Sequence, residues 1–114
     1  MGLFNFLKKN NKKDTTMTEI LNDFEKYLED KGYSKLTPSG NPSTTHDYSQ
    51  RRIPAIISRE GISLKQLIKD VSMVISKYDS FGSESDYGNK SNRAYINALK
   101  RFEEYIQSEY YSKK

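Results

Sequence analysis

The stretch SNRAYINALKRFEEYI, residues 91–106, decides the fold class of this chain. Its apolar residues recur every three or four positions, which is the spacing that places them on one side of an α-helix. They are Tyr95, Ala98, Leu99, Phe102 and Ile106. We therefore expect a helix that buries one apolar stripe, with Ser91 as its N-cap.

Two further helical segments begin with a capping box, in which two side chains satisfy free backbone amides of the first turn. The boxes are Thr16-Met-Thr-Glu19 and Ser63-Leu-Lys-Gln66, and Gly32 fits the C-terminal cap of the first helix. The stripes behind the two boxes consist of Met17, Ile20, Leu21, Phe24, Tyr27 and Leu28, and of Leu64, Leu67, Ile68, Val71, Val74, Ile75 and Tyr78.

Another helical segment lies between these two and ends at Gly61. Pro54 has no backbone N–H to donate inside this segment, which predicts either a kink or a helix that restarts at Ile53. Its candidate N-caps are Ser43, Thr44 and Thr45, and its apolar positions are Tyr48, Ile53, Ile56 and Ile57.

The connections and the stripes together predict the architecture. Residues 33–43 and 79–90 are rich in Gly, Pro, Ser and Asp and read as loops, and no alternation of period two predicts a sheet. Each helix is too short to be stable alone, so the stripes must pack on one another. We expect an all-α protein: a compact four-helix orthogonal bundle over residues 15–112, behind a flexible N-terminal tail of residues 1–14.

Composition argues against several classes of site. The chain has no Cys, so it offers neither disulfides nor thiolates, and its single His makes a His-based metal site implausible. His46 has neither a nucleophile nor an orienting group beside it in a catalytic pattern. We expect no catalytic residues, no metal, no cofactor and no small-molecule substrate, and hence no enzyme. The absence of Cys and of an export signal predicts a cytoplasmic protein.

The positive charge of the chain lies at its ends. The formal net charge is +4, with 19 basic and 15 acidic residues. Four Lys precede Asp14 and two more are the last residues, so the part between Asp14 and Ser112 has 13 basic and 15 acidic residues, a net charge of −2. Nucleic-acid binding would therefore have to use local patches of cations.

The order in which the predicted helices and their short sequence motifs follow one another resembles that of the SAM-like N-terminal (core-binding) domain of phage integrases and other tyrosine recombinases. The residues that carry the resemblance are Phe24, Tyr27, Leu28, Gly32, Thr44, Tyr48, Ser63, Tyr95, Ala98, Leu99 and Phe102, within residues 17–107. The catalytic set of that family is missing, since His46 is followed by Asp47-Tyr48-Ser49 instead of His-x-x-Arg. The resemblance implies an accessory domain of bacterial or phage origin that associates with DNA without chemistry.

The candidate DNA contacts are cations and one amide on the second and fourth predicted helices. Arg52 and Arg59 are seven residues apart and share a helix face, as do Arg93 and Lys100. Guanidinium, ammonium and amide groups all donate to phosphate oxygens, so weak contacts with the phosphate backbone are predicted. The alternative is that these are ordinary solvated helix faces. The candidates are Arg51, Arg52, Arg59, Arg93, Asn97, Lys100 and Arg101.

The N-terminal segment supports a second functional hypothesis. Its apolar residues Leu3, Phe4, Phe6 and Leu7 precede four Lys, which suits reversible docking to a protein partner or to an anionic membrane surface. The chain would then be a protein–protein interaction module tethered to a membrane or a larger complex. The alternative is a tail that binds nothing. Three aromatic residues, Tyr87, Tyr110 and Tyr111, are further candidates for partner contact.

Overall fold

The computed structural model describes residues 17–33 and 44–112. All regular secondary structure in these two ranges is helical, which confirms the predicted all-α class. The expected tail of residues 1–14, the N-cap residue Thr16 of the first capping box and most of the 33–43 loop lie outside the described residues.

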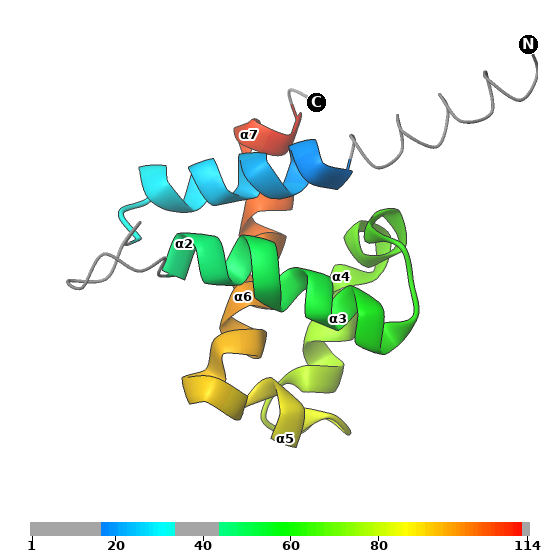
Figure 1. Ribbon diagram of the computed structural model, residues 1–114. Coiled ribbons are helices and arrows are strands. Elements are labelled where there is room, and N and C mark those ends of the chain that lie inside the picture. The colour runs from blue at the N-terminus through cyan, green and yellow to red at the C-terminus, as the bar shows by residue number, and fades with distance from the viewer. Residues whose placement is uncertain (1–16, 34–43, 113–114) are drawn as a thin grey trace, which may run out of the picture.

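The four predicted helices are present, and two short ones join them (Figure 1). The described part of the first helix covers residues 17–30. The second helical segment consists of α2, η1 and α3 in direct succession, and α5 and α7 are single turns that the sequence did not predict. The bounds are α2 Thr44–Asp47, η1 Tyr48–Arg52, α3 Ile53–Glu60, α4 Leu64–Tyr78, α5 Ser85–Gly88, α6 Lys90–Ile106 and α7 Glu109–Ser112.

The second segment neither kinks sharply nor restarts after a break: α3 begins at Ile53 directly after the π-helix η1. Within η1 the chain forms wider turns, and at its end the N–H of Ile53 donates to the carbonyl oxygen of Tyr48, five residues back. Pro54 then follows as the second residue of α3. The π-turn thus absorbs the proline without breaking the helical path.

Three of the predicted helix ends are confirmed by their hydrogen bonds. Gly32 and Gly61 have φ of 97° and 66°, a left-handed conformation that glycine adopts without strain, and the following amides bond back to the helix. The Ser63 side chain accepts a hydrogen bond from the backbone N–H of Gln66 at 3.0 Å. The other half of this capping box is wrong, because the Gln66 side chain donates to Asp70.

Neither Ser91 nor Thr45, which the sequence offered as N-caps of the two remaining helices, has that role. Ser91 is not the N-cap of α6: Ser91, Asn92 and Arg93 have φ of 56°, 59° and 67°, so they form one left-handed turn. Thr45 lies buried within α2 and its hydroxyl has no hydrogen-bond partner, so it is not a cap either. Ser43 lies outside the described residues.

The core surrounds α6. This helix packs against η1, α3, α4, α5 and α7, and Figure 1 shows it crossing behind the 17–30 helix and the α2–α3 segment. Phe102 meets Phe24 of the first helix edge to face, with ring centres 5.1 Å apart. The predicted stripe is shifted, because Ile96 and Tyr105 are fully buried whereas Tyr95 and Ile106 are only partly buried.

Candidate functional site

The seven residues predicted to contact DNA are all described, and the six cations among them all contact acidic side chains. The nitrogen–oxygen distances are 3.9 Å for Arg51–Asp47, 2.8 Å for Arg52–Asp47, 2.5 Å for Arg59–Glu84, 3.6 Å for Arg93–Asp79, 3.1 Å for Lys100–Asp79 and 2.9 Å for Arg101–Glu104. A phosphate group at any of these positions would have to compete with a carboxylate that is already in place.

Arg93 and Lys100 both reach the carboxylate of Asp79, but Arg93 lies in the left-handed turn, so the helix face predicted from their spacing is not what brings them together. The backbone N–H of Ser80 and the ammonium of Lys100 hold the pKa of Asp79 below its ordinary value. The ion pairs with Asp79 are made by Arg93 and Lys100 and do not include Asn97. The two cations therefore fasten the start of α6 to the end of α4.

The shared face of Arg52 and Arg59 is confirmed, and two aromatic rings occupy it. The Arg59 guanidinium lies 4.0 Å from the centre of the Tyr87 ring, and that of Arg52 lies 4.8 Å from the centre of the Tyr95 ring. The two rings are 4.4 Å apart. A hydrogen bond from Tyr87 lowers the pKa of Tyr95; burial opposes this, and the guanidinium of Arg52 adds to it. Arg59 thus packs α3 against α5, and Arg52 packs η1 against α6.

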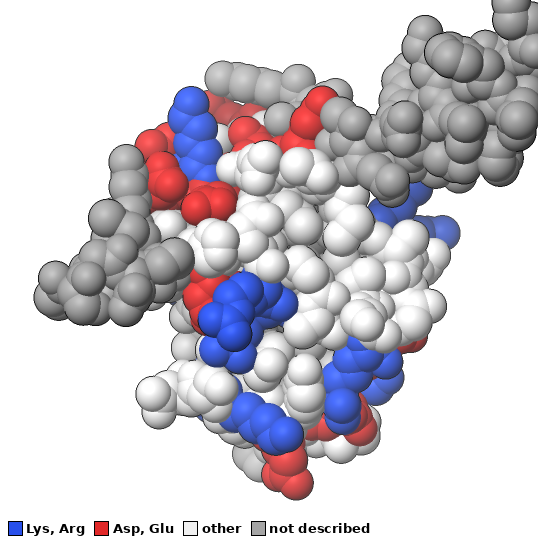
Figure 2. Space-filling view, in the orientation of Figure 1, with Lys and Arg blue, Asp and Glu red and all other residues white. Residues whose placement is uncertain are grey.

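The positive charges on one face of the described part are divided among several places. On the face shown in Figure 2 the Lys and Arg side chains form separate groups, and acidic side chains adjoin several of them. The two described ranges contain 12 basic and 14 acidic residues, a net charge of −2. The described part of the chain therefore has no excess of positive charge to attract a polyanion.

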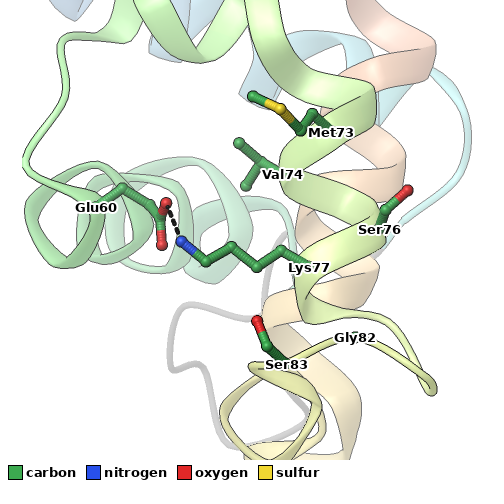
Figure 3. A pocket seen from close by; sticks show the side chains of 7 residues that line it. All are labelled: Glu60, Met73, Val74, Ser76, Lys77, Gly82 and Ser83. Carbon is green, nitrogen blue, oxygen red and sulfur yellow. Dashed lines mark hydrogen bonds and ion pairs between the residues drawn. The ribbon is translucent and has the colours of Figure 1, made fainter.

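A hollow of about 400 Å³ lies where the end of α3, the second half of α4 and the 79–84 loop meet (Figure 3). Glu60 of α3 faces Lys77 of α4 across it, with 2.9 Å between Oε1 and Nζ. Tyr78 also donates to Glu60, so although burial raises the pKa of Glu60, these two donors bring it below the ordinary value. The lining residues are Glu60, Met73, Val74, Ser76, Lys77, Gly82 and Ser83.

Two exposed apolar side chains border this hollow. Among the described residues, the large hydrophobic side chains that are exposed are Met73, at 66% of its reference area, and Phe81, at 104%. Met73 lines the hollow and Phe81 directly precedes Gly82, which also lines it. The exposed apolar surface of the described chain is therefore concentrated in one place, which we call the Phe81 surface: Phe81 together with the seven residues that line the hollow.

The turn that carries Phe81 is tied down by hydrogen bonds. The N–H of Gly82 donates to the carbonyl oxygen of Asp79 and that of Glu84 to the carbonyl oxygen of Lys77, both at 2.8 Å. A Cβ atom at Gly82 would lie 2.2 Å from the carbonyl oxygen of Lys77, so the turn sits directly on the end of α4. The backbone that carries Phe81 is thus held in place, and the Phe81 side chain lies in the solvent.

The sequence reasoning missed the Phe81 surface. The sequence feature that could have pointed to this surface is Phe81, an aromatic residue that directly follows Asp79 and Ser80 and precedes Gly82, Ser83 and Glu84 in the loop. Met73 gave a second signal, because it lies off the apolar stripe of α4. Neither signal shows that the two side chains border the same hollow, because that depends on how the loop folds back over α4.

The three tyrosines predicted to contact a partner lie instead against neighbours within the chain. Tyr87 packs on Tyr95, as described above. The Tyr110 ring lies 5.3 Å from that of Tyr27 and its hydroxyl donates to Asp30, and the Tyr111 ring lies 5.7 Å from that of Tyr105. Their aromatic area stabilises the docking of α5 and α7.

The remaining predictions concern the N-terminal apolar segment and the absence of metal and cofactor sites. Leu3, Phe4, Phe6 and Leu7 lie outside the described residues. In the part that is described, no helix has both the length and the apolar character needed to cross a membrane. The same residues include no group of three or more His, Asp and Glu arranged to hold a metal ion. The predicted absence of metals and cofactors stays a prediction.

Comparisons with protein-family models, with curated proteins and with solved structures found no match to this chain. The resemblance to the integrase N-terminal domain therefore stays a prediction.

Proposed function

We propose that this chain is a non-catalytic protein-interaction module whose contact surface is the Phe81 surface. The observation that carries the proposal is the position of Phe81 and Met73, the two large exposed apolar side chains of the described part, beside one hollow. Aromatic and Met side chains are enriched at the cores of protein interfaces, where they bury a large apolar area.

The chemistry of the hollow supports binding more than catalysis. Glu60 has a lowered pKa and an ion-paired partner, so it stays ionised near neutral pH and is a poor proton donor. Lys77 is held by the same ion pair. The remaining polar groups of the lining are two serine hydroxyls, with no His or Cys beside them to activate a nucleophile.

The test is retention of a protein partner from an extract of the source organism. Immobilised wild-type chain is compared with the double variant Phe81→Ser/Met73→Ser and with the control Lys65→Ser/Lys69→Ser, which alters exposed residues of α4 outside the hollow. We expect a protein that is retained by the wild type and the control and lost with the double variant. Equal retention by all three chains would place the contact elsewhere and contradict the proposal.

DNA association, the first hypothesis from the sequence, is the second candidate. The observation that favours it is the convergence of Arg93 and Lys100, 44% and 37% exposed, on the single carboxylate of Asp79. A phosphate could replace that carboxylate. A gel-shift titration at low salt tests this, with Asp79→Asn to release the two cations and Arg93→Ala/Lys100→Ala to remove them. DNA association predicts tighter binding for the first variant and weaker binding for the second; no shift at tens of micromolar protein would exclude it.

The membrane hypothesis and the compartment are separate proposals. Flotation with anionic vesicles, comparing the full chain with one that begins at Thr15, tests docking through Leu3, Phe4, Phe6 and Leu7. We expect the full chain alone to float if this segment binds lipid, and the hypothesis fails if both chains stay at the bottom of the gradient.

We propose the cytoplasm as the compartment, because a chain without Cys needs no oxidising environment.

A further inference from the structure

Tyr87 and Tyr95 form the closest aromatic pair among the described residues. Their ring centres are 4.4 Å apart and their planes are tilted by 36°. The other four tyrosine–tyrosine pairs that are in contact within the described ranges have ring centres 5.3–6.0 Å apart and planes at 59–81°. Tyr87 and Tyr95 are therefore the two tyrosines whose rings lie nearest to each other and nearest to parallel.

Three cations surround this pair. The Arg59 guanidinium lies 4.0 Å and the Lys90 ammonium 5.3 Å from the centre of the Tyr87 ring, and the Arg52 guanidinium lies 4.8 Å from the centre of the Tyr95 ring. Interaction with the Tyr87 hydroxyl is the main cause that lowers the pKa of Tyr95; burial opposes it, and Arg52 and Lys90 add to it. The two hydroxyl groups are thus neighbours, and so are the ring carbons beside them.

We propose that Tyr87 and Tyr95 are a site of oxidative modification, at which a dityrosine bond joins α5 to α6. A one-electron oxidant removes an electron and a proton from each phenol, and the two phenoxyl radicals form a bond between ring carbons next to the hydroxyls. Each of these carbons then releases its hydrogen as a proton and each oxygen regains one, which restores both phenols. The oxidant is hydrogen peroxide acting through a haem enzyme: one peroxide takes up the two electrons and two protons and becomes two water molecules.

The composition of the chain favours tyrosine as the oxidised side chain. Thiols and indoles compete with phenols for a one-electron oxidant, and the chain has nine Tyr but neither Cys nor Trp. The fold then favours one pair of tyrosines. In the pairs with planes at 59–81° the edge of one ring meets the face of the other, so the carbons beside the two hydroxyls are not brought together as they are in Tyr87 and Tyr95.

The bond should stabilise the fold if the two rings are already in position for it. It closes residues 87–95, which include the left-handed turn of residues 91–93. A covalent link restricts the unfolded chain, as a disulfide does. We therefore expect the cross-linked chain to unfold at a higher temperature than the unreacted chain. A lower unfolding temperature would show that the bond strains the fold and would contradict the proposed geometry.

Oxidation of the dilute full chain by hydrogen peroxide and a haem peroxidase tests the proposal. We expect dityrosine fluorescence in the monomer and a mass lower than 13.3 kDa by two hydrogen atoms. Oxidation of methionine adds oxygen and is distinguished by its higher mass. Cleavage after Lys77, Lys90, Arg93 and Lys100 separates the two tyrosines, so the bond should appear as peptide 78–90 joined to peptide 94–100.

Tyrosine-to-phenylalanine variants identify the pair, because phenylalanine keeps the ring and its packing but forms no phenoxyl radical. Tyr87→Phe and Tyr95→Phe should each abolish the bond, and Tyr87→Phe also distinguishes Tyr87 from Tyr78, which lies in the same peptide. The control Tyr110→Phe, whose ring meets that of Tyr27 at 81°, should cross-link like the wild type. The proposal is overturned if the monomer gains no dityrosine, if Tyr87→Phe leaves the bond intact, or if Tyr110→Phe abolishes it as completely as Tyr95→Phe.

Discussion

The Tyr78 hydroxyl donates a hydrogen bond to Oε2 of Glu60 at 2.6 Å and thereby joins α4 to the end of α3. Tyr78 is fully buried, and the Glu60 carboxylate, whose side chain is 14% exposed, also receives Lys77. The bond lies directly beneath the hollow of the Phe81 surface. It needs a protonated phenol and an ionised carboxylate, so its contribution to stability depends on pH at both ends of the scale.

We expect Tyr78→Phe to lower the free energy of unfolding by about 2 kcal/mol near pH 7, because a buried hydrogen bond to a charged group is lost. Burial and the Glu60 carboxylate raise the pKa of Tyr78 above 10, so the stabilisation is present below pH 10 and is lost at higher pH. The pKa of Glu60 is lowered from 4.5, so the stabilisation is also lost as pH falls below that value. Urea unfolding at several pH values should show wild type and variant converging at both extremes.

Tyr48→Phe is the matched control for this pH profile. Burial is the main cause that raises the pKa of Tyr48, whereas the Tyr78 hydroxyl bonds directly to a carboxylate. The difference between wild type and Tyr48→Phe should therefore stay constant between pH 7 and the acid range. If Tyr78→Phe behaves in the same way as Tyr48→Phe in acid, the Glu60 carboxylate is not the partner that matters.

Gly88→Ala should destabilise the chain, because α5 rests directly on the end of α4. A Cβ atom at Gly88 would lie 2.0 Å from the carbonyl oxygen of Tyr78, and this is backbone that cannot move aside cheaply. We expect a loss of about 1–3 kcal/mol in unfolding free energy, measured by chemical denaturation. The control is Asp86→Ala in the same turn, whose side chain is exposed and which should change stability by less than about 0.5 kcal/mol. Equal effects would mean that α5 does not pack as described.

Ser91→Gly should stabilise the chain, because Ser91 has a φ of 56° within the left-handed turn. A residue with a Cβ atom loses about 1–2 kcal/mol in this conformation, and the greater freedom of glycine in the unfolded chain offsets part of the gain. We expect a net gain of about 0.5–1 kcal/mol by thermal or chemical unfolding. Lys65→Gly, at an exposed position of α4 away from the distorted residue Asp70, should instead lose about 1 kcal/mol. A loss at Ser91 as well would show that the turn is right-handed in solution.

Arg52→Ala should cost more than Arg51→Ala, although the two arginines are adjacent in sequence. The Arg52 side chain is 18% exposed, bonds to Asp47 at 2.8 Å and lies over the Tyr95 ring, whereas the Arg51 side chain is 70% exposed. We expect a loss of about 1–2 kcal/mol for Arg52→Ala and less than about 0.5 kcal/mol for Arg51→Ala. Absorbance titration of the phenols should also show a raised pKa for Tyr95 in Arg52→Ala. Equal stabilities for the two variants would contradict a structural role for Arg52.

The short elements and the loop show where sequence reasoning stopped. The 3–4 spacing of apolar residues predicted the four main helices, because residues three or four apart lie on the same side of one helix and the pattern can be recognised within that segment alone. It could not predict α5, since the four residues Ser85–Gly88 carry no stripe, and the close fit of Gly88 against the carbonyl of Tyr78 joins segments that only the fold brings together. Ser91 was misassigned because a cap is predicted from local residue types, and these do not show that the residue has a left-handed conformation between α5 and α6.

The sequence by itself determined the all-α class and the glycine caps at Gly32 and Gly61, because each depends on the conformations allowed to residues close together in the chain. It also predicted that Arg52 and Arg59 share a face, whereas it left open whether the helix kinks at Pro54 or restarts at Ile53. Only the tertiary structure decided that Glu84 pairs with Arg59, that Asp79 pairs with Arg93 and Lys100, and that Met73 and the glycine after Phe81 line one hollow. Ion pairs and surface hollows form between segments distant in sequence, so their partners follow from packing.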